Sequence, residues 1–250
     1  MDPHDHLSRI STIWTMVIRA HGNDPQAVRI AQGGLIERYS GAVHRYLVKV
    51  LGDADAADEA FQELAVKLLR GGFRGADPQK GRFRDYLKSA VRNLAREYRR
   101  KCARHPKADL PERDITDARE PADHDLDASF LESCREEFLA RAWSALLDEQ
   151  QRSGKPYYTV LAVRAANPEL TSEQLAERLR QQGFASGSTS AAATRKLLER
   201  ARRRFAQHLL DDVAATVDAD TERQAIEEEL IDLGLLSYCR SALDARFAQS

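Results

Sequence analysis

The segment FRDYLKSAVRNLAREYRRKCAR, residues 83–104, carries an apolar stripe and a basic stripe at the same time. Its apolar residues recur at the three- and four-residue spacing of a buried helical face. Its basic residues recur about every four positions, which places them in one row along a helix. Between residues 82 and 104, nine Lys and Arg residues stand against two acidic ones. This surplus predicts a helix that buries one side and offers the other to a polyanion.

The rest of the chain repeats the helical period, and the alternating pattern of half-buried strands is missing. Gly and Pro lie mostly between the periodic segments, where they end helices. We therefore predict an all-α fold of two small helical domains joined by a flexible acidic linker. The expected helices are 8–20, 26–51, 53–70, 83–104, 127–151, 155–166, 172–179, 190–212, 222–233 and 237–247.

The domain boundaries follow from composition. Residues 26–104 are predicted to form the first domain and residues 127–213 the second. Helical extensions are expected at residues 1–25 and 214–250. Residues 105–126 between the domains contain proline, many acids and few large apolar side chains, as expected of a flexible linker.

The acidic linker has two interpretations. It is a solvated spacer, or it mimics DNA and shields the basic surfaces of the free protein. The second interpretation is motivated by the reversal of charge directly after the basic helix.

Residues 171–205 have the layout of a helix-turn-helix motif. A short helix from Ser172 is followed by a turn and by a second helix rich in arginine. In such motifs, the N-terminal face of the second helix contacts base edges in the major groove. An amphipathic hairpin with a solvated basic face is the alternative interpretation.

Three segments together resemble the second conserved region of bacterial sigma factors of the extracytoplasmic-function group. They are LIERYSGAVHRYLVKVLGD (35–53), AADEAFQELAVKLLRG (56–71) and GRFRDYLKSAVRNLAREYRR (81–100). The resemblance implies a helical domain that binds core RNA polymerase and helps to separate the −10 strands of promoter DNA. The termini suggest a subgroup with added helices.

The same resemblance implies the site residues of the first domain. The surface for core polymerase is expected at Asp58, Phe61, Gln62 and Glu63. The −10 DNA surface is expected at Arg84, Lys88, Arg92, Asn93, Arg96, Arg99 and Arg100. Phe73 and Arg74 precede the basic helix and are placed to hold a flipped base of the separated strands.

Residues 157–212 resemble the fourth region of the same family more loosely, through TSEQLA (171–176) and LERAR (198–202). This region reads the −35 element in the family. The residues expected to contact that element are Thr189, Ser190, Thr194, Arg195, Lys196, Arg200 and Arg203.

Composition limits the other classes of function. No apolar run reaches the ~20 residues of a membrane span, and the N-terminal residues do not resemble a signal peptide. The three cysteines are isolated, which fits free thiols in a reducing compartment. No metal-ligand spacing, phosphate-binding glycine loop or nucleophile–base pair is found, so we expect no cofactor and no catalysis.

We therefore predict a cytoplasmic, non-catalytic sigma subunit that is monomeric when free. Its expected partners are core RNA polymerase, double-stranded promoter DNA and the melted −10 strand, and an anti-sigma factor is left open. Two alternatives remain. One is a helix-turn-helix regulator that acts without polymerase, and the other is a helical protein-interaction module.

Overall fold

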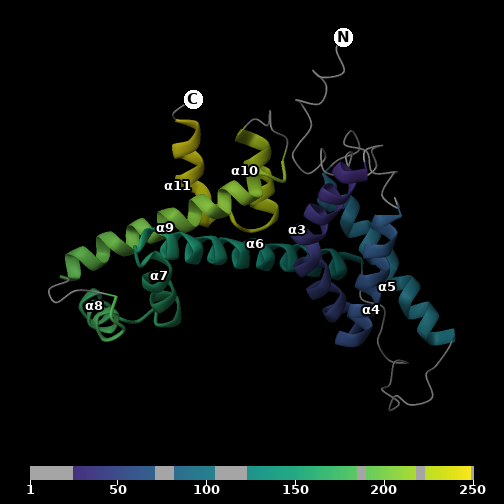
Figure 1. Cartoon of the computed structure of the whole chain (residues 1–250), viewed down its shortest axis with the longest axis horizontal. Coiled ribbons are helices and arrows are strands. Elements are labelled where there is room, and N and C mark those ends of the chain that lie inside the picture. Colours follow the sequence, from purple (N-terminus) through teal and green to yellow (C-terminus); the bar gives the residue numbers. More distant parts are fainter. Residues whose placement is uncertain (1–24, 71–81, 105–122, 185–189, 218–222, 249–250) are drawn as a thin grey trace, which may run out of the picture. The chain divides into compact units, whose positions relative to one another are not determined.

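The computed structural model describes residues 25–70, 82–104, 123–184, 190–217 and 223–248, and every regular element in these ranges is an α-helix. This result confirms the predicted all-α fold. The helices are α3 (Pro25–Leu51), α4 (Ala54–Leu69), α5 (Phe83–Arg104), α6 (Asp123–Ser153), α7 (Tyr157–Ala166), α8 (Ser172–Gln181), α9 (Ala191–Ala214), α10 (Arg223–Asp232) and α11 (Leu236–Phe247) (Figure 1). In the described parts, no helix combines the length and apolarity needed to span a bilayer.

The chain divides into two compact units, and each is described by itself. Unit 1 contains α3, α4, α5 and α6 up to Glu137. Unit 2 contains α6 from Phe138, then α7 to α9, α10 from Ile226 and α11.

Unit 1 begins with two helices that meet at a tight turn. Gly52, with φ of 72°, ends α3 in the left-handed conformation that glycine adopts without strain. Asp53 follows, and its carboxylate accepts a hydrogen bond of 2.8 Å from the amide of Ala56. This N-terminal cap satisfies a free amide at the start of α4. The chain therefore turns back at once, so that α4 packs on α3.

The core of unit 1 is built from one face of each helix. The fully or almost fully buried side chains come from all four elements: Val43, Tyr46, Leu47, Ala60, Leu87, Val91, Leu94, Phe130 and Cys134. The rings of Tyr46 in α3 and Phe130 in α6 meet edge to face, with their centroids 5.4 Å apart. The first half of α6 is thus part of the core of unit 1.

Helix α6 begins within the segment that composition predicts to be a linker. Its first residue is Asp123, and Leu126 is already buried. The helix therefore begins four residues before the predicted residue 127. The predicted end of the linker at residue 126 stays a prediction. Residues 105–122, most of the expected linker, lie outside the described residues.

Unit 2 is organised around an aromatic cluster. The indole of Trp143 in α6 lies 5.6 Å from the ring of Tyr158 in α7 and 5.1 Å from that of Phe205 in α9, between centroids. The side chain of Gln150 also pairs with Thr159, accepting from its amide and donating to its hydroxyl, both at 2.9 Å. These contacts attach α7 and α9 to the second half of α6.

Helices α8 and α9 lie where the sequence predicts a helix-turn-helix pair. Thr171 and Gln174 make a reciprocal capping box: the amide of Gln174 donates to the Thr171 hydroxyl at 3.3 Å, and the amide of Thr171 donates to the Gln174 side-chain oxygen at 2.8 Å. Gly183, with φ of 78°, ends α8, and the amide of Phe184 bonds back to the carbonyl of Leu179 at 3.0 Å. Part of the turn, residues 185–189, lies outside the described residues.

Candidate nucleic-acid interface

Helix α5 presents three kinds of surface. Its buried row contains Phe83, Arg84, Leu87, Val91, Leu94, Ala95 and Tyr98. A half-buried row contains Lys88, Arg92, Arg96 and Arg99, which we name the basic ridge. The remaining side is exposed and contains Asp85, Ser89, Asn93, Glu97 and Arg100. The basic residues of the sequence pattern therefore differ in exposure: one is buried, four are half-buried and Arg100 is exposed.

Arg84 is not a surface residue, which corrects its expected place in the DNA interface. Only 6% of it is exposed. The four-residue basic spacing connects Arg84 to Lys88, but Arg84 also lies three positions before Leu87 and seven before Val91, on the apolar row. Tertiary packing therefore decides its position, and its guanidinium lies beneath the surface that DNA would contact.

The basic ridge lies beside α3 and α6. The Lys88 ammonium is 3.1 Å from the Asp127 carboxylate of α6, and the Arg92 guanidinium is 3.9 Å from the same group. Arg99 donates a hydrogen bond to the backbone carbonyl of Val50 at the end of α3. The ridge is thus held in place by both neighbouring helices.

A small pocket opens at the middle of the basic ridge. It is lined by Tyr46, Val50, Arg92, Ala95, Arg96, Arg99 and Leu126. Burial raises the pKa of the Tyr46 phenol, although the nearby Arg92 acts in the opposite direction. Three guanidinium groups give the pocket a positive lining, but its volume of about 10 Å³ has room for only one water molecule.

Asn93 and Arg100 lie on the exposed side of α5, as a direct contact with nucleic acid requires. Phe73, Arg74 and Thr189 lie outside the described residues, so their predicted roles stay predictions.

The expected polymerase surface on α4 contains acids that already have intramolecular partners. Asp58 lies 2.8 Å from the His44 imidazole, and Glu63 accepts a hydrogen bond of 2.9 Å from Lys101. That hydrogen bond raises the pKa of the Lys101 ammonium. Both acids are more than one-third exposed, so a protein partner can still reach them.

The other residues of α4 complete a mixed surface. Gln62 is exposed and Phe61 is half-buried. Val66 is 43% exposed, although it was not among the expected site residues. The signal for it was present, because Val66 follows Gln62 by four positions and Asp58 by eight, and therefore lies on the same side of the helix. An apolar side chain among polar ones is typical of a protein interface.

Tyr98 belongs to the core and links α5 to α4. It is buried, and its hydroxyl donates a hydrogen bond of 2.7 Å to Glu59. Burial first, and then this hydrogen bond, raises the pKa of the phenol. Glu59 also lies 3.7 Å from Lys101. Tyr98 thus connects α5 to α4.

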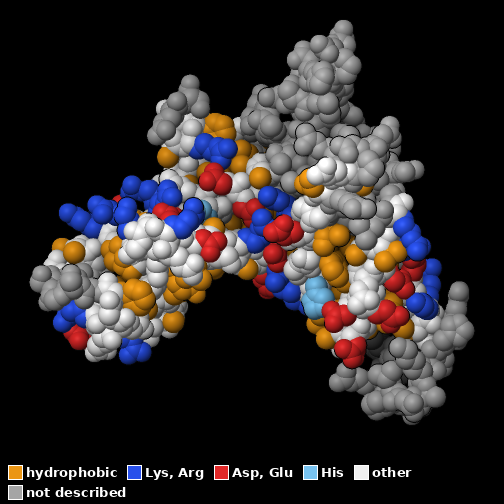
Figure 2. Space-filling model, in the orientation of Figure 1, with side chains coloured by type: hydrophobic (Ala, Val, Ile, Leu, Met, Phe, Trp, Pro, Cys, Tyr) orange, Lys and Arg blue, Asp and Glu red, His pale blue; other side chains and the backbone are white. Residues whose placement is uncertain are grey.

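In unit 2, α9 offers a row of exposed cations. Figure 2 shows Lys and Arg side chains gathered over this helix, and the exposed ones are Arg195, Lys196, Arg200, Arg202 and Arg203. Ser190 is exposed too, and its hydroxyl accepts a hydrogen bond of 3.2 Å from the amide of Ala193. The exposed cations are spaced along the first half of α9, where a recognition helix contacts DNA.

Thr194 corrects the expected set at the start of α9. Only 1% of it is exposed, so its side chain does not lie on the DNA side. It lies four positions before Leu198 and seven before Ala201, both buried. The polar character of threonine suggested a surface position, but the helical row to which it belongs is the core row.

Arg204 is turned away from the exposed cations by an acid of α6. Its Nε lies 2.7 Å from the Glu149 carboxylate, which also accepts from His208 at 2.8 Å. Burial acts to raise the pKa of Glu149, but the hydrogen bonds from Arg204 and His208 outweigh it and leave this pKa lowered. Glu149 therefore serves as an internal anion that fastens α9 to α6.

Comparison with known families gives a match within the first unit. Residues 35–105 match the family model described as sigma-70 region 2. Comparison with curated proteins and with solved structures gives no match. The match covers most of α3, all of α4 and all of α5, the helices that carry the basic ridge and the α4 surface. Residues 35–105, about a quarter of the chain, are therefore similar to sigma-70 region 2.

Proposed function

We propose that the chain directs promoter-specific initiation as an extracytoplasmic-function type sigma factor in the cytoplasm. Unit 1 binds core RNA polymerase through α4 and binds the −10 element through α5. Unit 2 binds the −35 element through α9. The observation that carries the proposal is the sigma-70 region 2 match, because it falls on the helices whose exposed faces are basic or mixed polar and apolar.

The proposed core-binding surface consists of Asp58, Phe61, Gln62, Glu63 and Val66. It combines two accessible carboxylates with an exposed valine and a half-exposed phenylalanine. Removing the apolar members from water would supply affinity, while the carboxylates would fix the orientation of the partner.

For the −10 element, we propose that the basic ridge holds phosphates and that Asn93 and Arg100 reach the separated strand. The ridge is half-buried and ordered by neighbouring helices, which lowers the entropy lost when it grips a backbone. Phe73 and Arg74 remain proposed contacts of a flipped base.

For the −35 element, we propose that α8 and α9 act as the helix-turn-helix pair. Ser190, Arg195, Lys196, Arg200 and Arg203 are all exposed on α9 or at its start, and the capping box fixes the beginning of α8. Thr189 remains a proposed contact. Thr194 is left out of the proposed surface because it is buried.

Core binding is the decisive experiment. The purified chain is mixed with core RNA polymerase and separated by gel filtration, beside the variants Val66→Glu and Ile231→Glu. Both replaced residues are exposed and apolar, at 43% and 56%, but only Val66 lies on α4. We expect the wild type and Ile231→Glu to co-elute with core and Val66→Glu to lose much of this binding. A folded wild type that elutes apart from core, yet binds duplex DNA tightly, would instead indicate a free regulator.

A further inference from the structure

The first half of α6 covers one side of the surface that α5 offers to DNA. Asp127 lies 3.1 Å from Lys88 and 3.9 Å from Arg92, at one end of the basic ridge. Leu126, the preceding residue, is buried and lines the pocket of the three arginines. An acid and an apolar side chain from α6 therefore contact the ridge that the proposed function assigns to the DNA backbone.

A carboxylate at this position resembles the natural ligand of the ridge. Phosphate oxygens and carboxylate oxygens bind Lys and Arg at the same distances and with the same sign of charge. DNA phosphate can pair fully with Lys88 and Arg92 only when the Asp127 carboxylate has left them. The two anions therefore compete for one site.

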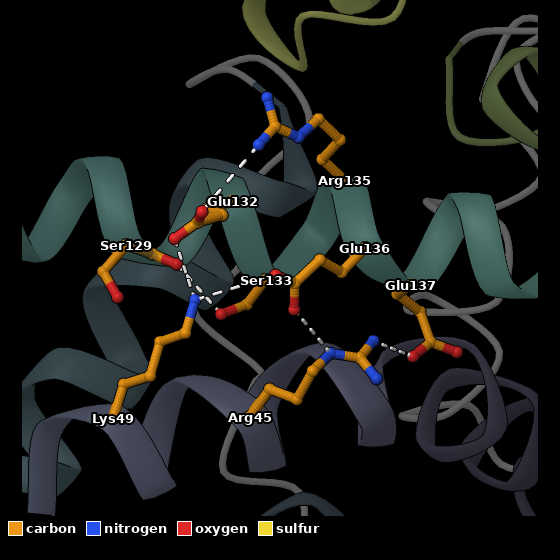
Figure 3. Close-up of polar contacts among 8 residues, drawn as sticks. All are labelled: Arg45, Lys49, Ser129, Glu132, Ser133, Arg135, Glu136 and Glu137. Atoms are coloured by element: carbon orange, nitrogen blue, oxygen red, sulfur yellow. Dashed lines mark hydrogen bonds and ion pairs between the residues drawn. The ribbon is translucent and has the colours of Figure 1, made fainter. Parts of the chain in front are cut away.

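A ladder of ion pairs holds α6 in this position. Lys49 of α3 lies 2.8 Å from Glu132 and 3.9 Å from Glu136. Arg45, one turn earlier, lies 3.5 Å from Glu136 and also pairs with Glu137. Figure 3 shows both cations extending from α3 toward the acids of α6. We name this set the α3–α6 clamp.

The clamp sets the register of α6 against α3. Exposed ion pairs contribute little singly, but here two cations share three acids, so the network resists displacement more than one pair would. Beneath it, the buried ring of Phe130 packs on Tyr46. Together these contacts fix Asp127, which lies further toward the start of the same helix, beside Lys88 and Arg92.

We propose that the first half of α6, residues 123–137, is an autoinhibitory element of the free protein. Asp127 competes with DNA phosphate for Lys88 and Arg92, and the α3–α6 clamp keeps the Asp127 carboxylate beside these two cations. The inference rests on the proposed function, because it requires the basic ridge to bind DNA. It goes beyond the shielding that composition suggests, since the competing group is one residue of a docked helix.

The first test removes the competing charge. Binding of the purified full-length chain to a fluorescein-labelled oligodeoxythymidine of about 20 nucleotides is measured by anisotropy at low salt. Asp127→Asn is compared with Asp148→Asn, an exposed acid about six turns further along α6 whose replacement changes the net charge equally. We expect Asp127→Asn to bind about three- to tenfold more tightly, and Asp148→Asn to differ little from the wild type. Equal affinity of the two variants would overturn the proposal.

The salt dependence of the same binding separates competition from a general charge effect. Each phosphate contact regained on the ridge should steepen the slope of log affinity against log salt by about 0.7 for a single strand. Asp127→Asn should show the steeper slope, and Asp148→Asn should keep the slope of the wild type. Parallel slopes for all three proteins would count against competition at the ridge.

The second test loosens the clamp. Lys49→Glu places a carboxylate opposite Glu132 and Glu136, and it makes the protein more negative by two charges. Net charge alone would weaken DNA binding, whereas release of α6 should strengthen it by about twofold or more. The exchange Lys49→Glu/Glu132→Lys has the net charge of the wild type and restores a pair, so it should restore wild-type affinity. Weaker binding by Lys49→Glu would overturn the role of the clamp. Thermal melting by circular dichroism verifies that each variant is folded.

One further variant distinguishes the inference from the function on which it rests. Arg92→Ala should weaken binding and should cancel most of the gain when combined with Asp127→Asn. If Arg92→Ala weakens binding while Asp127→Asn does not strengthen it, autoinhibition fails and the DNA-binding ridge stands. If neither substitution changes binding, the ridge itself is not the DNA surface.

Discussion

A Cβ atom at position 41 would overlap a carboxylate oxygen of Glu137, so the Glu137 side chain of α6 occupies space beside α3 that is open because residue 41 is a glycine. The same carboxylate pairs with Arg45, one turn along α3. The missing side chain of Gly41 thus permits the closest part of the α3–α6 clamp.

Replacement of Gly41 by alanine should displace the Glu137 carboxylate and break its pair with Arg45. Alanine gains about 1 kcal/mol in helix propensity, and the lost ion pair offsets a similar amount, so the free energy of unfolding should change little. In an Arg45→Ala background no pair remains to lose, and Gly41→Ala should then stabilise by about 1 kcal/mol. Urea unfolding of the four proteins in this cycle measures the coupling, and purely additive effects would mean that Gly41 and the ion pair are independent.

The hydroxyl of Tyr98 should contribute to stability and not to DNA binding. Tyr98→Phe removes the hydrogen bond to Glu59 and should lower the free energy of unfolding by about 1 kcal/mol. Tyr238→Phe, at an exposed position of α11, is the matched control and should change stability by less than about 0.5 kcal/mol. A large loss of oligonucleotide binding by Tyr98→Phe, with stability unchanged, would instead make the tyrosine a stacking residue.

The two neighbours Thr194 and Arg195 should behave in opposite ways. Thr194→Val conserves volume at a buried site, so it should keep binding to duplex DNA. It should also keep or raise stability, because among the described residues the Thr194 hydroxyl has no hydrogen-bond partner. Arg195→Ala should reduce upstream-element binding by about 1–3 kcal/mol if it reads a base, and should weaken all sequences equally if it holds a phosphate. Duplex binding of the holoenzyme tests both, and a binding defect in Thr194→Val alone would reverse the assignment.

The stabilising effect of Glu149 should disappear in acid. Its pKa in the folded protein lies below the ordinary value, so its contribution is fully present above the unfolded pKa, about 4.3, and is lost as the pH falls through the folded pKa. The difference in unfolding free energy between wild type and Glu149→Gln should therefore be constant near neutral pH and shrink below about pH 4. A difference that grows on acidification would contradict the sign of the shift.

The double substitution Arg92→Ala/Arg96→Ala should impair promoter opening more than assembly with polymerase. Both arginines belong to the basic ridge on α5, whereas the proposed polymerase surface is on α4. Permanganate reactivity of unpaired thymines measures opening, and gel filtration measures assembly. Loss of assembly with opening preserved would place the polymerase surface on α5.

Local sequence signals predicted the helices well because the signals that start and end them act over a few residues. Gly52 and Gly183 both adopt positive φ at helix ends, and Thr171 forms its capping box with a partner three positions away. The start of α6 was less predictable. Its first turns lie in an acidic segment that composition assigns to a linker, and the burial of Leu126 depends on contacts with the rest of unit 1.

The candidate site shows the same division. The exposed cations of α9 follow from its sequence, but the different positions of Arg203 and Arg204 do not. Arg203 pairs with Glu199 one turn away and stays exposed, whereas Arg204 is held by Glu149, 55 residues earlier in the chain. Arg84 likewise fits both the four-residue spacing of the basic row and the spacing of the apolar row. The sequence alone does not decide to which row it belongs, because this depends on packing against the other helices.

The buried thiol of Cys134 on α6 can report the proposed release of this helix from α3. All three cysteines of the chain lie within the described helices, Cys102 exposed and Cys134 and Cys239 buried. Burial raises the pKa of Cys239 to about 12, so this thiol reacts very slowly at neutral pH. A thiol reagent should therefore modify Cys102 at once and reach Cys134 only when α6 lifts from α3. The lag between these two reactions would time the release of the helix without any engineered label.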